Sequence, residues 1–180
     1  VGAGDRVSRY VYDARGQLVE ERKAAGTEFE IKIRYEVDGL GQRTALIDPR
    51  GVELSEDNSA WAQSVRKAQG YGHDVSSLSL SDQAALQELY TTRYGYDARS
   101  NLVQELDPLG GLTTSEYDAL GNLVKATDPN QNLLDEADRK SGYFFYDTNG
   151  RLSLQVDPLG YVIERVYDAM DRVVEERVYQ

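Results

Sequence analysis

The chain has 180 residues, no cysteine and a formal net charge of −11 at pH 7. The absence of cysteine excludes disulfides, thiolate metal sites and cysteine nucleophiles, and the acidic charge argues against nucleic-acid partners, whose phosphates are bound by clustered Lys and Arg. Thirteen Tyr residues against three Phe and one Trp predict β-strands over a thin core, because Tyr favours a pleated, half-buried surface.

The first predicted elements are two β-hairpins. One turns at Tyr12 and Asp13, with Gly16 three residues after the aspartate, and the other turns at Asp38 and Gly41, with Val in place of Tyr. In such a turn the Asp side chain accepts hydrogen bonds from backbone N–H groups, and Gly takes the left-handed conformation that closes a short hairpin with a bulge. We therefore expect strands of about 6 to 8 residues beside each turn.

A second motif, Asp-Pro, lies ten residues after a Tyr-Asp aspartate. It first occurs at Asp48 and Pro49, and Gly51 follows two residues after the proline. The proline presets φ at the second turn position and the glycine serves a left-handed site, so the motif predicts the turn that leads from one hairpin to the next. The first hairpin lacks this partner, because Lys23 stands ten residues after Asp13.

A helical insertion is expected to interrupt the array at residues 52–93, where 38 extra residues precede the next Tyr-Asp copy. Within it, residues 58–70 are predicted as a helix capped by Asn58 or Ser59, and residues 81–90 as a second helix. The insertion holds the chain's single Trp and single His. Segments of this kind on a rigid scaffold are where partner contacts tend to lie.

The second half of the chain repeats the hairpin four times. Copies start at Tyr96 and Tyr117, which are 21 residues apart, and at Tyr146 and Tyr167, which repeat the same interval. A fixed period of this length predicts a repeat protein in which each unit packs against its neighbours.

Ser100, Gln131 and Asp171 depart from the pattern, since they stand at glycine positions. Eight extra residues around 133–140 predict a polar excursion at one rim of the sheet. The residues predicted to maintain the turns are Tyr12, Asp13, Gly16, Asp38, Gly41, Asp48, Pro49, Gly51, Tyr96, Asp97, Asp107, Pro108, Gly110, Tyr117, Asp118, Gly121, Asp128, Pro129, Tyr146, Asp147, Gly150, Asp157, Pro158, Gly160, Tyr167 and Asp168.

Catalytic and metal-binding interpretations of these residues are weaker than the structural one. An EF-hand loop starting at Asp128 fails, because Arg139 stands where the bidentate Glu belongs. The turn register explains carboxylate pairs such as Asp168 with Asp171, and the single His73 has no nucleophile motif beside it. We therefore predict no catalytic residue, no metal site and no cofactor, and hence no enzyme.

The Tyr-Asp-x-x-Gly-x-Leu and Asp-Pro-x-Gly motifs at this period resemble those of the RHS-repeat, or YD-repeat, family. The resemblance covers about residues 6–180 apart from the insertion. The family includes bacterial polymorphic toxins, the cocoon components of insecticidal ABC toxins and animal teneurins. It implies an all-β fold of repetitive antiparallel hairpins, forming a curved sheet within a spiralling shell. Residues 1–51 and 94–180 would then be one repeat array from a longer chain.

The function that the resemblance implies is structural. The chain is expected to be a shell segment of an RHS-repeat toxin that encapsulates a C-terminal effector before delivery. Expected partners are the rest of the shell and the enclosed toxin domain, with a secretion-system protein as a further candidate, but neither nucleic acid nor a membrane span. No signal peptide is visible, so synthesis in the bacterial cytoplasm before secretion or delivery is expected. The alternative is an extracellular adhesion or carbohydrate-binding module, whose Tyr rings would stack on sugars.

Overall fold

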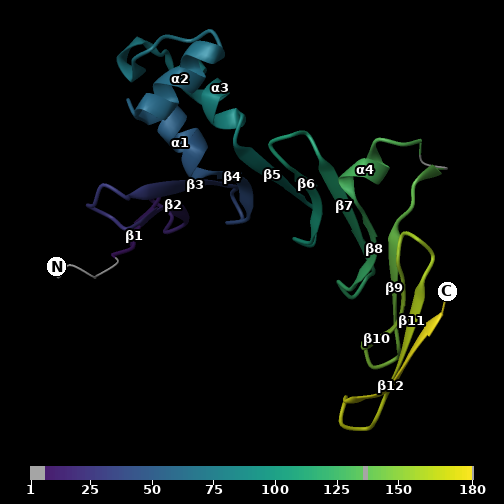
Figure 1. Ribbon diagram of the computed structural model, residues 1–180. Coiled ribbons are helices and arrows are strands. Elements are labelled where there is room, and N and C mark those ends of the chain that lie inside the picture. The colour runs from purple at the N-terminus through teal and green to yellow at the C-terminus, as the bar shows by residue number, and fades with distance from the viewer. Residues whose placement is uncertain (1–6, 136–137, 180) are drawn as a thin grey trace. The chain divides into compact units, whose positions relative to one another are not determined.

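The computed structural model describes residues 7–135 and 138–179, and it confirms the all-β fold class (Figure 1). The strands belong to one sheet of 12 strands, in which the strand order follows the chain order from β1 to β12. Successive strands pair in antiparallel fashion, as in hairpins placed one after another. A few short helices are inserted between the strands.

The strands are short, as the spacing of the turns predicts. They are β1 (Arg9–Tyr12), β2 (Leu18–Lys23), β3 (Ile31–Val37), β4 (Arg43–Ile47), β5 (Thr91–Tyr96), β6 (Leu102–Leu106), β7 (Leu112–Tyr117), β8 (Leu123–Thr127), β9 (Gly142–Tyr146), β10 (Leu152–Val156), β11 (Val162–Tyr167) and β12 (Val173–Tyr179). The helices are α1 (Pro49–Glu56), α2 (Ala60–Ala68), the 3₁₀ turn η1 (Val75–Ser77), α3 (Leu80–Glu88) and α4 (Pro129–Asn132).

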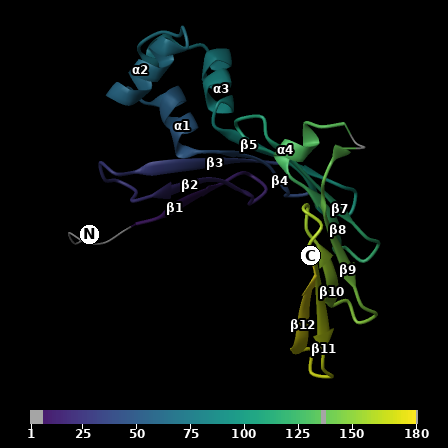
Figure 2. The ribbon, with the colours of Figure 1, turned by 45° about the vertical axis from the view of Figure 1, so that its right-hand side comes forward.

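The chain divides into two compact units, residues 1–94 with 107–110 and residues 95–106 with 111–180. In the first unit, strands β1 to β4 pair in sequence, and α1, α2 and α3 lie on one side of them in both views (Figures 1 and 2). The helices precede β5, which pairs with β4.

A β-bulge lies beside the turn in the hairpins of the Tyr-Asp type. The register shifts between Val11 and Tyr12 in the first hairpin and between Glu36 and Val37 in the second. The same shift separates Glu116 from Tyr117 in the second unit. An extra residue on one strand increases the local twist, so these bulges fix both the register and the bend of each hairpin.

The helical insertion has its own small core. Leu54, Ala62 and Leu86, one from each of α1, α2 and α3, are completely buried. Ser59 caps α2 by accepting a hydrogen bond from Ala62 N–H, and Ser79 caps α3 in a capping box with Asp82. The helices begin at Pro49 and β5 begins at Thr91, so the insertion is shifted slightly toward the N-terminus relative to the predicted bounds.

The prediction of a turn at Asp48, Pro49 and Gly51 is wrong, because these residues begin α1. Asp48 is the N-cap, its side chain accepts a hydrogen bond from Arg50 N–H, and Pro49 occupies the first helical turn, where its missing N–H costs nothing. A Cβ added to Gly51 would lie 3.1 Å from Ile47 Cγ2, from Gln87 O and from Tyr90 Cβ. This glycine therefore serves close packing of α1 rather than a left-handed turn.

The prediction for Asp128 and Pro129 is corrected in the same way. Asp128 is the N-cap of the short helix α4, in which Pro129 is the first residue. The end of this helix is tied to the sheet by Asn132, whose Nδ2 donates to Leu112 O at 2.7 Å and to Thr127 O at 3.1 Å. Of the predicted excursion at 133–140, residues 136–137 lie outside the described residues.

The core is thin. Among the described residues, every apolar side chain classed as buried lies between Ala25 and Leu86, in the first unit. The buried side chains of the second unit that are polar, Thr127 and Ser141, bond to each other through their hydroxyls at 2.8 Å. The second unit therefore depends mainly on the backbone hydrogen bonds between its strands and on the hydrogen bonds of its turns.

Candidate functional site

The recurring feature of this molecule is the Tyr-Asp turn, and the copy at Asp118 shows its geometry. Asp118 Oδ1 accepts hydrogen bonds from Leu120 N–H at 2.8 Å and Asn122 N–H at 2.9 Å. The backbone closes the same ring, since Asp118 N–H donates to Asn122 O at 2.9 Å and Gly121 N–H to Asp118 O at 3.1 Å. One carboxylate oxygen thus satisfies two backbone donors that a bare loop would leave to water.

The other Tyr-Asp copies have the same arrangement. In each, the aspartate Oδ1 accepts from the backbone N–H groups two and four residues later, at 2.8 to 3.0 Å. The copies are Asp13 with Arg15 and Gln17, Asp38 with Leu40 and Gln42, Asp97 with Arg99 and Asn101, Asp147 with Asn149 and Arg151, and Asp168 with Met170 and Arg172.

A second contact, which sequence reasoning missed, completes what we call the turn lock. The side chain four residues after the aspartate donates to its other oxygen, Oδ2, at 2.7 to 2.9 Å in five copies. The donors are Gln42 Nε2, Asn101 Nδ2, Asn122 Nδ2, Arg151 Nε and Arg172 Nε. The signal was present in the sequence, because this position is Gln, Asn or Arg in all six copies.

The turn lock shifts the ionisation of the aspartates. In Asp97 and Asp118 the side-chain hydrogen bond from the following Asn, aided by backbone N–H groups, lowers the pKa below its ordinary range. In Asp38, Asp147 and Asp168 the backbone N–H four residues later is the largest cause of a lowered pKa. The side-chain donor comes second in Asp147 and Asp168, whereas in Asp38 it follows the backbone N–H of Leu40. Hydrogen bonds to the charged form favour it, so these carboxylates are ionised in the folded protein near neutral pH.

Two non-glycine residues occupy the left-handed site of the turn. Ser100 has φ 68° and Asp171 has φ 60°, against 86° for Gly121 at the same place. The backbone bonds of the turn are retained, since Ser100 N–H donates to Asp97 O at 3.0 Å. Asp171 also receives a hydrogen bond from Arg151 Nη1 at 2.8 Å. The turn therefore forms without glycine, at the cost that the left-handed conformation imposes on a side chain.

Neighbouring Tyr-Asp turns are also tied to each other in pairs. A side chain from the first turn of a pair reaches the backbone of the second. In the first pair the side-chain carbonyl oxygen of Gln17 accepts from Gly41 N–H at 3.2 Å, with the amide assigned so that its NH2 group donates to Asp13 Oδ2 at 3.3 Å. In the other two pairs Arg99 Nη1 donates to Ala119 O at 3.0 Å, and Arg151 Nη1 donates to Asp168 O at 3.1 Å. Each pair lies within one compact unit.

Tyrosines of the motif connect successive hairpins in the second unit. Tyr146 Oη donates to Leu123 O at 2.9 Å, and Tyr167 Oη donates to Leu152 O at 2.7 Å. In both cases the acceptor is the leucine that follows the preceding Tyr-Asp turn. Arg151 also lies over the ring of Tyr167, with 4.7 Å between the guanidinium carbon and the ring centroid. Both hydroxyls and the ring of Tyr167 are thus occupied by contacts within the sheet.

The Asp-Pro motif forms a turn in two places. Asp107 Oδ1 accepts from Leu109 N–H at 2.8 Å, and Asp157 Oδ1 accepts from Leu159 N–H at 2.8 Å. The glycines that close these turns, Gly110 and Gly160, have φ of 85° and 94°. The tip leucines Leu109 and Leu159 are among the most exposed apolar side chains of the described residues.

The other acidic residues singled out in the sequence are paired with arginines, and the histidine faces solvent. In the described part of the chain, no group of three or more His, Asp or Glu side chains converges to hold a metal ion. Asp168 and Asp171 each pair with an arginine, Arg172 and Arg151 respectively, and His73 is exposed. None of the helices in the same described residues is long and apolar enough to cross a membrane.

The recurring turn lock and the chain-order sheet define a β-hairpin repeat protein in which the recurring spacing of the motif places the turns. Residues 96–133 and 146–178 match the family described as RHS Repeat, which confirms the predicted resemblance to the RHS-repeat family in these two stretches. These two stretches contain the Tyr-Asp turns of the second unit.

Among solved structures, the chain is similar to the crystal structure of TcdB2-TccC3 without its hypervariable C-terminal region, with 15% identity over 96% of this chain and 10% of that chain and a TM-score of 0.28. It is also similar to a Photorhabdus luminescens Tc holotoxin pore with a substituted TccC3, with 13% identity over 94% of this chain and 11% of that chain and a TM-score of 0.23. The chain spans about a tenth of the length of these solved chains. No curated protein matches the sequence.

Proposed function

We propose that this chain is a wall segment of a bacterial RHS-repeat toxin, whose shell encloses a C-terminal effector polypeptide until delivery. The observation that carries the proposal is the turn lock, repeated at five of the six Tyr-Asp hairpins of a sheet that contains RHS repeats. A repeated lock of this kind builds a wall by adding like units edge to edge, so the array gains area without a large core. Its partners in this role are the flanking repeats and the enclosed effector.

Containment requires that the wall keep its shape while an unfolded or inactive polypeptide lies against it. Two features of the chain suit that role. The turn locks satisfy backbone donors at the hairpin ends, where a sheet would fray first. The links from Arg99 to Ala119 O and from Arg151 to Asp168 O hold adjacent hairpins together at their tips. In this role the turn aspartates, glycines and prolines are structural, and none of them acts on a substrate.

The test is to purify the full-length parent protein and combine electron microscopy, mass spectrometry and limited proteolysis. We expect a hollow particle that contains a separate C-terminal polypeptide. That polypeptide should resist protease in the particle and be digested quickly when it is expressed alone. An open ribbon, or a C-terminal segment that is digested equally fast in both preparations, would refute containment and favour the adhesion alternative.

A further inference from the structure

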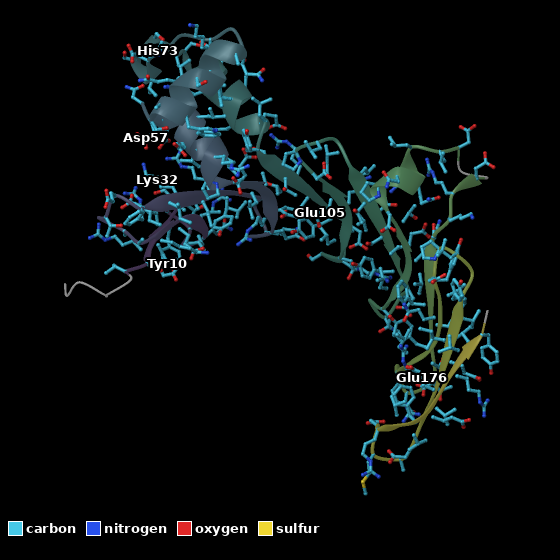
Figure 3. All side chains as sticks on the ribbon, viewed as in Figure 1. Tyr10, Lys32, Asp57, His73, Glu105 and Glu176 are labelled. Carbon is cyan, nitrogen blue, oxygen red and sulfur yellow. The ribbon has the colours of Figure 1, made fainter. Side chains whose placement is uncertain are left out.

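A pocket of about 420 Å³ lies in the first unit, between α1 and the segment that leads into β3. No Tyr-Asp turn contributes to it, so it is separate from the turn locks. Lys32 and Asp57, both labelled in Figure 3, belong to its lining from the two sides. The complete lining is Glu28, Phe29, Glu30, Ile31, Lys32, Pro49, Val52, Glu53, Glu56, Asp57 and Ser59.

Part of the lining is apolar and open to solvent. Phe29 is 74% exposed and Ile31 is 43% exposed, although both are large hydrophobic residues. Val52, on α1, is buried and forms the inner part of the lining together with Pro49. Grouped exposed apolar residues that surround a pocket mark a binding surface more often than isolated ones do.

The rest of the lining is strongly acidic. It holds five carboxylates against the single ammonium of Lys32. Glu56 is neutralised, because it forms ion pairs with Arg34 and with Lys32, the latter at 3.6 Å. Glu30 accepts a hydrogen bond from Gly26 N–H at 2.7 Å.

Two other carboxylates complete the charge of the pocket. Glu53 accepts a hydrogen bond from the Ser59 hydroxyl, and Asp57 accepts one from Asn58 N–H at 3.2 Å. Among the ion pairs of the described residues, none includes Glu28. The pocket therefore combines an apolar surface with an excess of negative charge.

We propose that this pocket docks a segment of a partner polypeptide in which Lys or Arg stands next to a large apolar residue. The carboxylates of the pocket favour a Lys or Arg of the partner by charge complementarity, and the exposed Phe29 and Ile31 favour an apolar partner residue beside it. A Lys or Arg side chain suits both, since its methylene stem packs on apolar surface and its charged head reaches the carboxylates. The ring of Phe29 offers a further site for the cation. This proposal goes beyond containment and holds whether or not the shell encloses an effector.

The test measures binding of a fluorescein-labelled peptide, Gly-Ser-Lys-Leu-Lys-Leu-Lys-Ser-Gly, to the 180-residue chain by fluorescence polarisation. Two control peptides replace every Leu by Ser or every Lys by Glu. Two variants alter the pocket, Glu28→Gln and Phe29→Ser, at side chains that the fold leaves outside its core. The matched control is Glu105→Gln, which removes an exposed carboxylate from β6, a strand that does not line the pocket.

We expect the Lys-Leu peptide to bind, with Kd weakened about three- to fivefold by Glu28→Gln and about three- to tenfold by Phe29→Ser. The Glu105→Gln variant should leave Kd unchanged, and the Lys-to-Glu peptide should not bind. Equal weakening by Glu105→Gln would show attraction to the net charge of the chain alone, and equal binding of the Leu-to-Ser peptide would show a site for charge alone. Either result, or no binding of the Lys-Leu peptide, overturns the proposal.

Discussion

At the scale of single residues, each Tyr-Asp turn depends on how one aspartate distributes its two oxygens. Asp118 Oδ1 accepts hydrogen bonds from two backbone N–H groups, and Asp118 Oδ2 accepts one from the side chain of Asn122. The backbone part needs a left-handed residue at Gly121, and the side-chain part needs a donor at Asn122. The two requirements are separable, so each can be tested by its own substitution.

Gly121→Val should lower the stability of the folded chain. A Cβ at this position would meet only Asn101 Oδ1 at 3.7 Å, which is ordinary contact, so the effect comes from φ of 86° and not from crowding. A β-branched residue in the left-handed region should cost about 1–2 kcal/mol, or about 2–8 °C in Tm. Thermal unfolding followed by circular dichroism measures it. Ala119→Val, in the same turn, should have a much smaller effect, and an unchanged Tm for Gly121→Val would remove this account of the turn.

Asn122→Leu should raise the pKa of Asp118 toward its ordinary value of 3.8, because the side-chain hydrogen bond from Asn122 is the largest cause of the lowered pKa. The backbone N–H bonds to Oδ1 remain, so the return should be partial. An NMR titration of the Asp118 carboxyl carbon measures the shift. Leu120→Ala serves as the control, since Leu120 contributes only its backbone. Equal titration of Asp118 in the Asn122→Leu variant and the unchanged chain would contradict the turn lock.

At the scale of elements, the chain alternates two kinds of connection between hairpins. Short turns at Asp107 and Asp157 join β6 to β7 and β10 to β11, whereas Asp48 and Asp128 begin helices after β4 and β8. In chain order, β1–β4, β5–β8 and β9–β12 are therefore three four-stranded modules, each with two Tyr-Asp turns. The side-chain links between turns join the two turns inside each module. The structural period is thus two hairpins, twice the period of the motif.

The helical insertion is held by a buried arginine. Arg66 is fully buried on α2, and its guanidinium donates to Leu54 O and Asp57 O at 2.7 Å and to His73 O at 3.0 Å. It also donates to Asn58 Oδ1 at 3.1 Å. These acceptors terminate α1 and hold the loop after α2, so one side chain organises segments that are separate in sequence.

Arg66→Met should therefore loosen the insertion selectively. The packing volume is kept, but several carbonyl oxygens lose their donor, at a cost of about 2–3 kcal/mol. Hydrogen exchange followed by mass spectrometry should show faster exchange in α2 and α3 while β9 to β12 keep their protection. Lys67→Met, at the exposed neighbouring position, should leave exchange unchanged. Faster exchange throughout the chain would show that the insertion is not an independent cooperative element.

At the scale of the whole molecule, the turn aspartates together affect how the stability of the fold depends on pH. The pKa values of five of them are lowered, each by hydrogen bonds within its own turn. A carboxylate with a lowered pKa in the folded state stabilises the fold above its ordinary pKa of 3.8, and this contribution disappears as pH falls through the folded value. The same small effect repeated along the array makes acid a specific stress on this sheet.

The pH dependence of stability should follow from this set. These aspartates should leave Tm unchanged between about pH 6 and 8, and Tm should fall progressively below about pH 4. Thermal unfolding from pH 2 to 8 measures the profile. In a chain carrying Asp97→Asn, Asp118→Asn and Asp147→Asn, Tm should be lower near neutral pH and should fall less steeply in acid. An acid limb of equal steepness in both chains would assign the acid sensitivity to other carboxylates.

The sequence by itself determined the features that arise from local interactions. Tyr-Asp turns depend on contacts within five residues, so the spacing of Asp118 and Gly121 is enough to predict a hairpin, and the 21-residue interval is enough to predict an array of hairpins. The donor at Asn122 was also readable, as a position that is always Gln, Asn or Arg. It was overlooked because the three side chains differ in shape and share only an N–H group.

Only the tertiary structure decided what each Asp-Pro motif does. Asp48 and Asp107 begin the same four-residue pattern, yet the first caps a helix and the second closes a turn. The difference at Asp48 comes from distant residues, because Gly51 is packed against Gln87 and Tyr90 of the insertion. The pocket beside Phe29 and the burial of Arg66 likewise depend on segments brought together by folding. Interactions between residues far apart in sequence leave no fixed spacing, so a repeat pattern alone cannot contain them.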